Sequence, residues 1–156
     1  MGTKYWLTLC SLVTALISGC AAQTVQVIKT PKPPRVIVVA ESIWDGIFTE
    51  KQVIQGESAY QKACAECHMH DLSGHEMASP LVGSVFTFRW RNKSIAALFE
   101  SIRTTMPQTA PGSLGDQEYL DIIAFLLDQS GYPKGLQQLD YGLGKLSRYK
   151  IERPKK

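Results

Sequence analysis

Cys64-Ala65-Glu66-Cys67-His68 is the stretch from which the fold of this chain can be predicted. Two cysteines separated by two residues, with a histidine directly after the second, form the pattern by which a c-type haem is attached. Both thiols can add to the haem as thioethers, and the adjacent imidazole can bind the iron. A Cys-x-x-Cys pair alone also occurs in thioredoxin-like redox sites and in zinc sites. Haem is favoured because the histidine is present, no βαβ pattern surrounds the motif and no second Cys-x-x-Cys follows.

Composition limits the range of functions. The chain has 156 residues, 44% of them hydrophobic, and a net charge of +3. This length suits one compact domain with extensions. The charge is small and dispersed, and no stripe of aromatic and basic residues is visible, so nucleic-acid binding is excluded.

The first residues have the layout of an export signal. Lys4 is followed by a mostly apolar run, Tyr5 to Ile17, which is shorter than the ~20 residues of a membrane-spanning helix. Ile17-Ser18-Gly19-Cys20 resembles the bacterial lipobox, in which the chain is cut before a cysteine that then carries lipid. We therefore expect residues 1–19 to be a signal peptide, which includes Cys10, and Cys20 to be the lipidated N-terminus.

Ordinary signal-peptidase cleavage near Ala21 or Ala22 is the alternative, and it would give a soluble periplasmic protein. In either case the chain is exported to the side of the membrane where c-type haem is attached. The residues after Cys20 lack the aspartate that resembles an inner-membrane retention signal, which favours the outer membrane for the anchor.

Two segments flank the predicted domain. Residues 20–42 contain Pro31, Pro33 and Pro34 among polar residues and read as an extended tether. Residues 134–156 form a basic extension, interpreted either as a solvated tail or as a docking surface for an acidic partner or anionic lipid. From Gly131 onward the sequence contains seven basic residues but only two acidic ones, Asp140 and Glu152, which gives a local net charge of +5.

Three helices are predicted from caps and periodicity. Thr49 and Gln52 have the spacing of a capping box, so a helix is expected from there to about Ala65. A second helix, from about 94 to 104, carries an apolar stripe, and a third, from about 116 to 129, repeats apolar residues at helical spacing. The sequence thus predicts an all-α protein.

Several motifs together resemble the class I cytochromes c. They are Gly56 and Tyr60 in the first helix, Cys64 to His68, and the later Met106-Pro107. Asp71-Leu72-Ser73-Gly74, Pro80-Leu81-Val82-Gly83, residues 98–107 and residues 111–119 further resemble the small cytochromes that accompany pyrroloquinoline-quinone dehydrogenases. The resemblance covers residues 43–133 and implies three or more helices around one covalently bound haem c, with the first and last helices crossing at Gly56 and Tyr60. The chain departs from that group at His70 and Met77.

The resemblance also implies roles for single residues. His68 and Met106 would be the iron ligands, with Met77 the next candidate and an open sixth position the third. Met69 and His70 follow His68 directly and are poorly placed to reach the opposite side of a haem. His75 and Met77 are within reach, but the resemblance implies that their loop covers the His68 side of the haem. The carbonyl of Pro80 would hold the His68 ring. Trp90, with Arg91 and Asn92 after it, would contact the haem propionates, although a plain structural role for Trp90 is almost as well supported.

These features predict an electron carrier rather than an enzyme. The resemblance suggests that it accepts electrons from a quinoprotein dehydrogenase and passes them to a terminal oxidase chain. A haem-based ligand sensor or peroxidase-like protein, with an open or displaceable sixth ligand, is the alternative. A tethering subunit with a passive haem is a third hypothesis.

Overall fold

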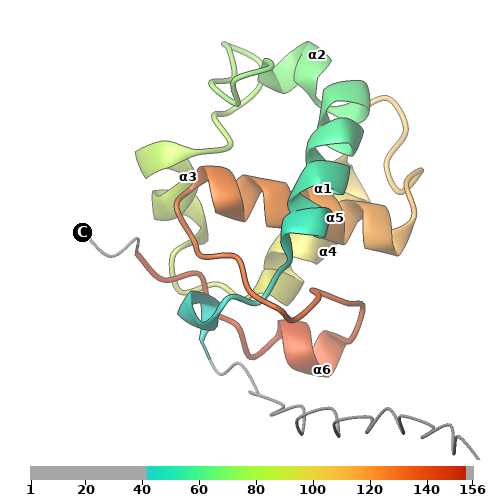
Figure 1. The fold of residues 1–156 in the computed structure, drawn as a ribbon. Coiled ribbons are helices and arrows are strands. Elements are labelled where there is room, and N and C mark those ends of the chain that lie inside the picture. The colour runs from blue at the N-terminus through green and yellow to red at the C-terminus, as the bar shows by residue number, and fades with distance from the viewer. Residues whose placement is uncertain (1–41, 154–156) are drawn as a thin grey trace, which may run out of the picture. The chain divides into compact units, whose positions relative to one another are not determined.

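The computed structural model describes residues 42–153, and Figure 1 shows that this part of the chain is built from helices. In order they are η1 (Ile43–Asp45), α1 (Glu50–Ala63), α2 (Ala65–His68), α3 (Gly83–Trp90), α4 (Ile95–Thr105), α5 (Asp116–Gln129) and α6 (Leu143–Leu146). Residues 42–153 contain isolated bridges but no strand, so the predicted all-α class is confirmed. The predicted signal peptide, Cys20 and most of the tether lie outside the described residues. Within the described range, none of the helices combines the length and the apolar character needed to cross a membrane.

Helix α1 begins where its capping box predicts. The backbone N–H of Gln52 donates to the Thr49 hydroxyl at 3.2 Å, and the side-chain oxygen of Gln52 accepts from the backbone N–H of Thr49 at 3.4 Å. These two bonds satisfy donors that a helix start leaves without partners. The helix ends at Ala63, with Cys64 as its C-cap. The first predicted helix is therefore confirmed, and it leads directly into the cysteine motif.

Helices α1 and α5 cross at a glycine. A Cβ atom on Gly56 would lie 1.8 Å from the carbonyl oxygen of Asp121, so the two backbones are in direct contact. One turn along α1, the ring of Tyr60 packs against Phe125 with a centroid separation of 5.5 Å. The crossing of these helices at Gly56 and Tyr60 is as expected.

Helices α4 and α5 also match their predicted ranges. The Ser94 hydroxyl accepts from the Ala97 N–H at 3.2 Å and caps α4. Ile95, Leu98 and Phe99 on this helix are buried, as its apolar stripe predicts. Helix α5 ends at Gln129, and Gly131 then adopts a positive φ of 86°, which glycine accepts without strain.

In the described part of the basic extension, residues 134–153, apolar side chains pack on the domain and do not form a solvated tail. Leu139, Leu146 and Tyr149 are buried, and so is Ile151, which bonds through its N–H to the Lys93 carbonyl at 2.9 Å. An antiparallel bridge pairs Lys150 with Ser94 at the start of α4. These four apolar residues belong to the domain core. They are widely spaced among charged residues, so the sequence pattern did not indicate that the segment is buried.

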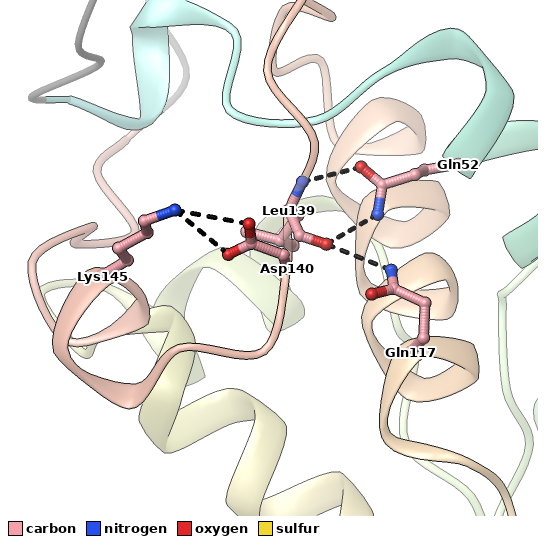
Figure 2. Close-up of polar contacts among 5 residues, drawn as sticks. All are labelled: Gln52, Gln117, Leu139, Asp140 and Lys145. Carbon is pink, nitrogen blue, oxygen red and sulfur yellow. Dashed lines mark hydrogen bonds and ion pairs between the residues drawn. The ribbon is translucent and has the colours of Figure 1, made fainter.

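A buried amide fixes this segment to the helices (Figure 2). The Gln52 side chain accepts from the Leu139 N–H and donates to the Leu139 carbonyl, both at 2.8 Å. Its amide group also lies 2.9 Å from the carboxylate of Asp121, which receives a second bond from Gln117 at 2.9 Å. The buried polar groups therefore partner one another, as burial requires.

Candidate haem site

The cysteine motif forms one helical turn at the edge of a cavity. The N–H groups of Cys67 and His68 both donate to the Cys64 carbonyl, at 3.1 and 2.9 Å. This turn brings both thiols and the imidazole to a cavity of about 310 Å³. Both cysteines are free thiols; Cys64 is half-buried and Cys67 is exposed. The three motif residues predicted from the sequence are thus gathered at one cavity.

The two thiols of the motif differ in burial, which affects the pKa of Cys64. Burial, with smaller contributions from the nearby Cys67 and Glu118, raises the pKa of the Cys64 thiol to about 11. Reactive cysteines in dithiol redox sites have lowered pKa values instead. The shift at Cys64 is opposite in direction to that of an activated thiolate.

The loop after the motif is folded tightly upon itself. The Gly74 N–H donates to the His68 carbonyl at 3.0 Å, and the Leu81 N–H donates to the Leu72 carbonyl at 2.9 Å. Gly74 has φ of 65°, and a Cβ atom there would lie 2.2 Å from the Ala78 carbonyl oxygen. Only glycine fits this position, and the compact loop returns Ser79 and Pro80 to the cavity.

His68 is oriented by this loop. Its Nδ1 lies 2.9 Å from the carbonyl oxygen of Ser79, which can only accept a hydrogen bond. Nδ1 therefore carries the proton, and Nε2 keeps a lone pair for a metal ion. The prediction named the carbonyl of Pro80, one residue later, and was wrong on that point. Pro80 restricts the residue before it to an extended backbone, which directs the Ser79 carbonyl, and Pro80 itself lines the cavity.

Met106 enters the cavity from the end of α4. Its N–H donates to the Ile102 carbonyl at 2.8 Å, as the last bond of the helix. Its own carbonyl accepts from the hydroxyl of Tyr119 on α5, at 2.7 Å. The following Pro107 cannot continue the helix. Met106 therefore has its backbone fixed on both sides while its side chain is half-buried at the cavity.

Of the rival ligands, Met77 alone lines this cavity, and its side chain is 89% exposed. Met69, His70 and His75 are not among the lining residues. The His70 ring bonds to Gln61, and the His75 ring accepts from the Met77 N–H at 3.1 Å. In residues 42–153, no three or more His, Cys, Asp or Glu side chains form a group that could hold a metal ion.

Helix α3 brings two residues to the cavity: Trp90, which the sequence analysis named, and Arg89, which it did not. Trp90 is buried and lines the cavity, and so does the exposed Arg89 before it. The guanidinium of Arg89 lies 5.9 Å from the Trp90 ring centroid, and the ammonium of Lys93 lies 5.0 Å from it. The run of basic residues around Trp90 was the signal for Arg89, since a cation at a haem pocket can pair with a propionate.

The donor set and the walls fit a covalently held haem. Two thiols, one imidazole with a free lone pair and two thioethers, the half-buried Met106 and the exposed Met77, line the same cavity, and the remaining walls are mostly apolar. Those walls come from four helices and the loop before α3, and include Tyr60, Leu81, Phe86, Leu98, Ile102, Ile122 and Leu126. A pocket with apolar walls and a few placed polar groups is typical of cofactor sites.

An all-α fold with this motif beside the cavity is consistent with the cytochrome c fold. The comparison with protein families agrees: residues 51–126 match the family model described as cytochrome C oxidase, cbb3-type, subunit III. The matched range contains the motif and Met106, and it supports a class I c-type cytochrome that transfers electrons through haem. No significant match was found among curated proteins or solved structures.

Proposed function

We propose that this protein is a monohaem electron carrier, and not an enzyme, with haem c attached to Cys64 and Cys67 and its iron held by His68 and Met106. The observation that carries the proposal is that all four residues line one cavity. When bound, the haem supplies reversible one-electron exchange at iron, and His/Met ligation raises its potential.

The side chains of this chain have distinct tasks in that function. The Ser79 carbonyl keeps the His68 tautomer that leaves Nε2 available. The Tyr119 hydroxyl holds the backbone of Met106 so that its sulfur stays at the cavity. The apolar walls exclude water, which keeps reorganisation on electron transfer small. Trp90 and Arg89 are the proposed neighbours of the propionates.

We further propose an exported protein on the periplasmic side, with residues 1–19 removed and Cys20 lipidated, the anchor preferring the outer membrane. Its proposed electron donor is a quinoprotein dehydrogenase and its proposed acceptor belongs to a terminal oxidase chain. The match to a family described as an oxidase subunit supports the acceptor side of this assignment.

Mass spectrometry of the mature protein tests attachment. The expected mass equals the chain from Cys20 plus one haem plus the acyl groups. A mass without haem would overturn the covalent site, and a mass that begins at residue 22 or 23 without lipid would overturn the anchor alone.

Substitution of Met106 tests the ligand set. We expect Met106→Ala to abolish the near-infrared band of methionine-ligated ferric haem and to lower the reduction potential by on the order of 0.1 V, within the ~0.8 V range that axial ligands control. Met77→Ala is the matched control, because Met77 also lines the cavity, and should change neither. An unchanged spectrum in Met106→Ala would contradict the assignment, and ready binding of carbon monoxide by the reduced wild type would favour a sensor or peroxidase-like function.

A further inference from the structure

Helix α3 exposes an apolar face. Val85 is 50% exposed and Phe88 is 80% exposed, whereas Phe86 and Trp90 on the same helix are buried. Val85, Phe88 and Arg89 are spaced by three and four residues, so they share one face of the helix. An exposed phenylalanine beside a valine is a marker of an interaction site when charged residues surround it.

Cations surround this face. Arg89, Arg91 and Lys93 are exposed, and within residues 42–153 none of them forms an ion pair with a carboxylate. Lys51, Lys62 and Arg148 elsewhere on the surface are also exposed without an ion pair in the described part of the chain, whereas two further exposed lysines are paired. Lys134 pairs with Glu50 and Asp128, and Lys145 pairs with Asp140. The charges near α3 are therefore available to a partner.

The C-terminal segment adds a further cation. The bridge between Ser94 and Lys150 places Lys150 beside the start of α4, where the N–H of Ile151 also bonds to the Lys93 carbonyl. Lys150 is exposed, and Glu152 is the acidic residue that follows it. Part of the basic extension thus belongs to the same surface as α3.

This surface is continuous with the candidate haem site. Arg89 lines the cavity, and so does Trp90, whose ring lies 5.0 Å from the Lys93 ammonium. A partner seated here would meet the protein where the cavity wall is formed by α3. Such a position suits electron exchange, because only the residues of α3 would then separate the proposed haem from the redox centre of the partner.

We propose that the α3 patch, defined as Val85, Phe88, Arg89, Arg91, Lys93 and Lys150, docks a redox protein with an acidic rim and an apolar centre. This proposal rests on the proposed electron-transfer function. Complementary charge steers such encounters and sets their orientation. A membrane surface is a weaker fit, because α3 has eight residues and offers only Val85 and Phe88 as exposed large apolar side chains, whereas interfacial helices present a long apolar face.

The test uses the full-length holoprotein and a gold electrode coated with mixed carboxylate- and methyl-terminated thiols, which imitates the proposed rim and centre. Adsorbed mass reports docking, and the voltammetric wave reports redox function. We expect the triple variant Arg89→Gln, Arg91→Gln, Lys93→Gln to adsorb roughly tenfold more weakly at low salt. Phe88→Ser should lose the part of adsorption that depends on methyl groups.

The matched control is Lys51→Gln, Lys134→Gln, Lys145→Gln, which removes the same charge from residues that do not line the cavity. It should keep most of the adsorption. Equal losses in both triple variants would overturn the α3 patch, as would unchanged adsorption in the first. A missing voltammetric wave with normal adsorption would instead overturn the proposed function.

Binding to lipid vesicles tests whether the α3 patch docks a membrane surface and not a protein. Adding phosphatidylglycerol to phosphatidylcholine vesicles should increase binding of the α3 triple variant and of the control variant equally. An increase that the α3 variant alone lacks would assign the patch to a lipid surface and overturn the protein partner.

Discussion

At the α1–α5 crossing, backbone lies against backbone, whereas one to two turns further along, the same two helices become walls of a cavity. Near Gly56 there is no room for a methyl group beside Asp121. At Ala63 on α1 and Leu126 on α5 the helices instead face a space of about 310 Å³. One helix pair therefore has one end closed by protein atoms and another end that leaves room for a ligand.

The difference shows how the two ends obtain their stability. The closed end relies on close packing and on buried hydrogen bonds, both of which the chain supplies itself. The cavity end has the donor groups and walls of a cofactor site, and under the proposed function the haem completes its core. Small domains commonly depend on such a bound group. Substitutions at the closed end should therefore act on folding, and those at the cavity end mainly on the cofactor.

Gly56→Ala should have the largest effect on the closed end. The added methyl would meet the Asp121 carbonyl oxygen at 1.8 Å, which only separation of the helices can relieve. Alanine favours a helix over glycine by about 1 kcal/mol, but overpacking against backbone costs about 3 kcal/mol or more. We expect a net loss of roughly 2 kcal/mol or more in the free energy of unfolding, measured with urea.

Gly115→Ala is the control for this substitution. Gly115 has φ of −69°, and no atom lies within 4 Å of its added Cβ. Because Gly115 is the N-cap of α5, where alanine is less favourable than glycine, its unfolding free energy should fall by about 0.5–1 kcal/mol, clearly less than that of Gly56→Ala. If Gly56→Ala were as stable as this control, the crossing would not be closed by backbone contact.

Gln52→Met should have the next largest effect. The side chain keeps its length but no longer accepts from the Leu139 N–H, which is buried. Asp121 and the Leu139 carbonyl keep their bonds from Gln117. The orphaned buried Leu139 donor costs about 1–3 kcal/mol, and loss of the weaker 3.4 Å capping bond from the Thr49 N–H adds to this.

Proteolysis shows where that stability is lost. In Gln52→Met the segment 135–153 should be cleaved faster, because its main attachment to α1 is gone. Gln55→Met, on the exposed side of the same helix, should match the wild type in both measurements. Unchanged cleavage of the segment would contradict the role assigned to Gln52.

The fold was predictable where the signals are local. Thr49 and Ser94 cap their helices, and the apolar residues of α4 and α5 repeat at helical spacing, so these elements follow from neighbouring residues. Helix α3 has no capping side chain and contains β-branched and aromatic residues, which hid it. The buried C-terminal segment depends on Gln52, 87 positions away from Leu139, and no local pattern reveals such a contact.

The site divides in the same way. Cys64, Cys67 and His68 form a contiguous motif, and the sequence was enough to predict a haem site there. The carbonyl that orients His68 was assigned one residue too late, because the effect of Pro80 falls on the backbone of Ser79. The contact of Tyr119 with Met106 was not predicted. Its bond to the Met106 carbonyl joins two helices and depends on their packing.

Tyr119→Phe should have the smallest effect on folding and a selective effect on the cavity end. It removes the hydroxyl that holds the Met106 carbonyl at 2.7 Å but keeps the buried ring against Phe99. The hydroxyl also accepts from the Leu114 N–H at 3.5 Å, and the loss of the short bond to Met106 together with this long one costs about 1 kcal/mol in unfolding free energy. Because the backbone of Met106 is then less restrained, the methionine-ligand band should disappear at lower denaturant concentration and at less alkaline pH than in the wild type. Tyr141→Phe is the control, since Tyr141 also packs on Phe99 but is half-exposed. If the band instead disappeared at the same denaturant concentration and pH as in the wild type, while stability fell as expected, the role of Tyr119 would be purely structural.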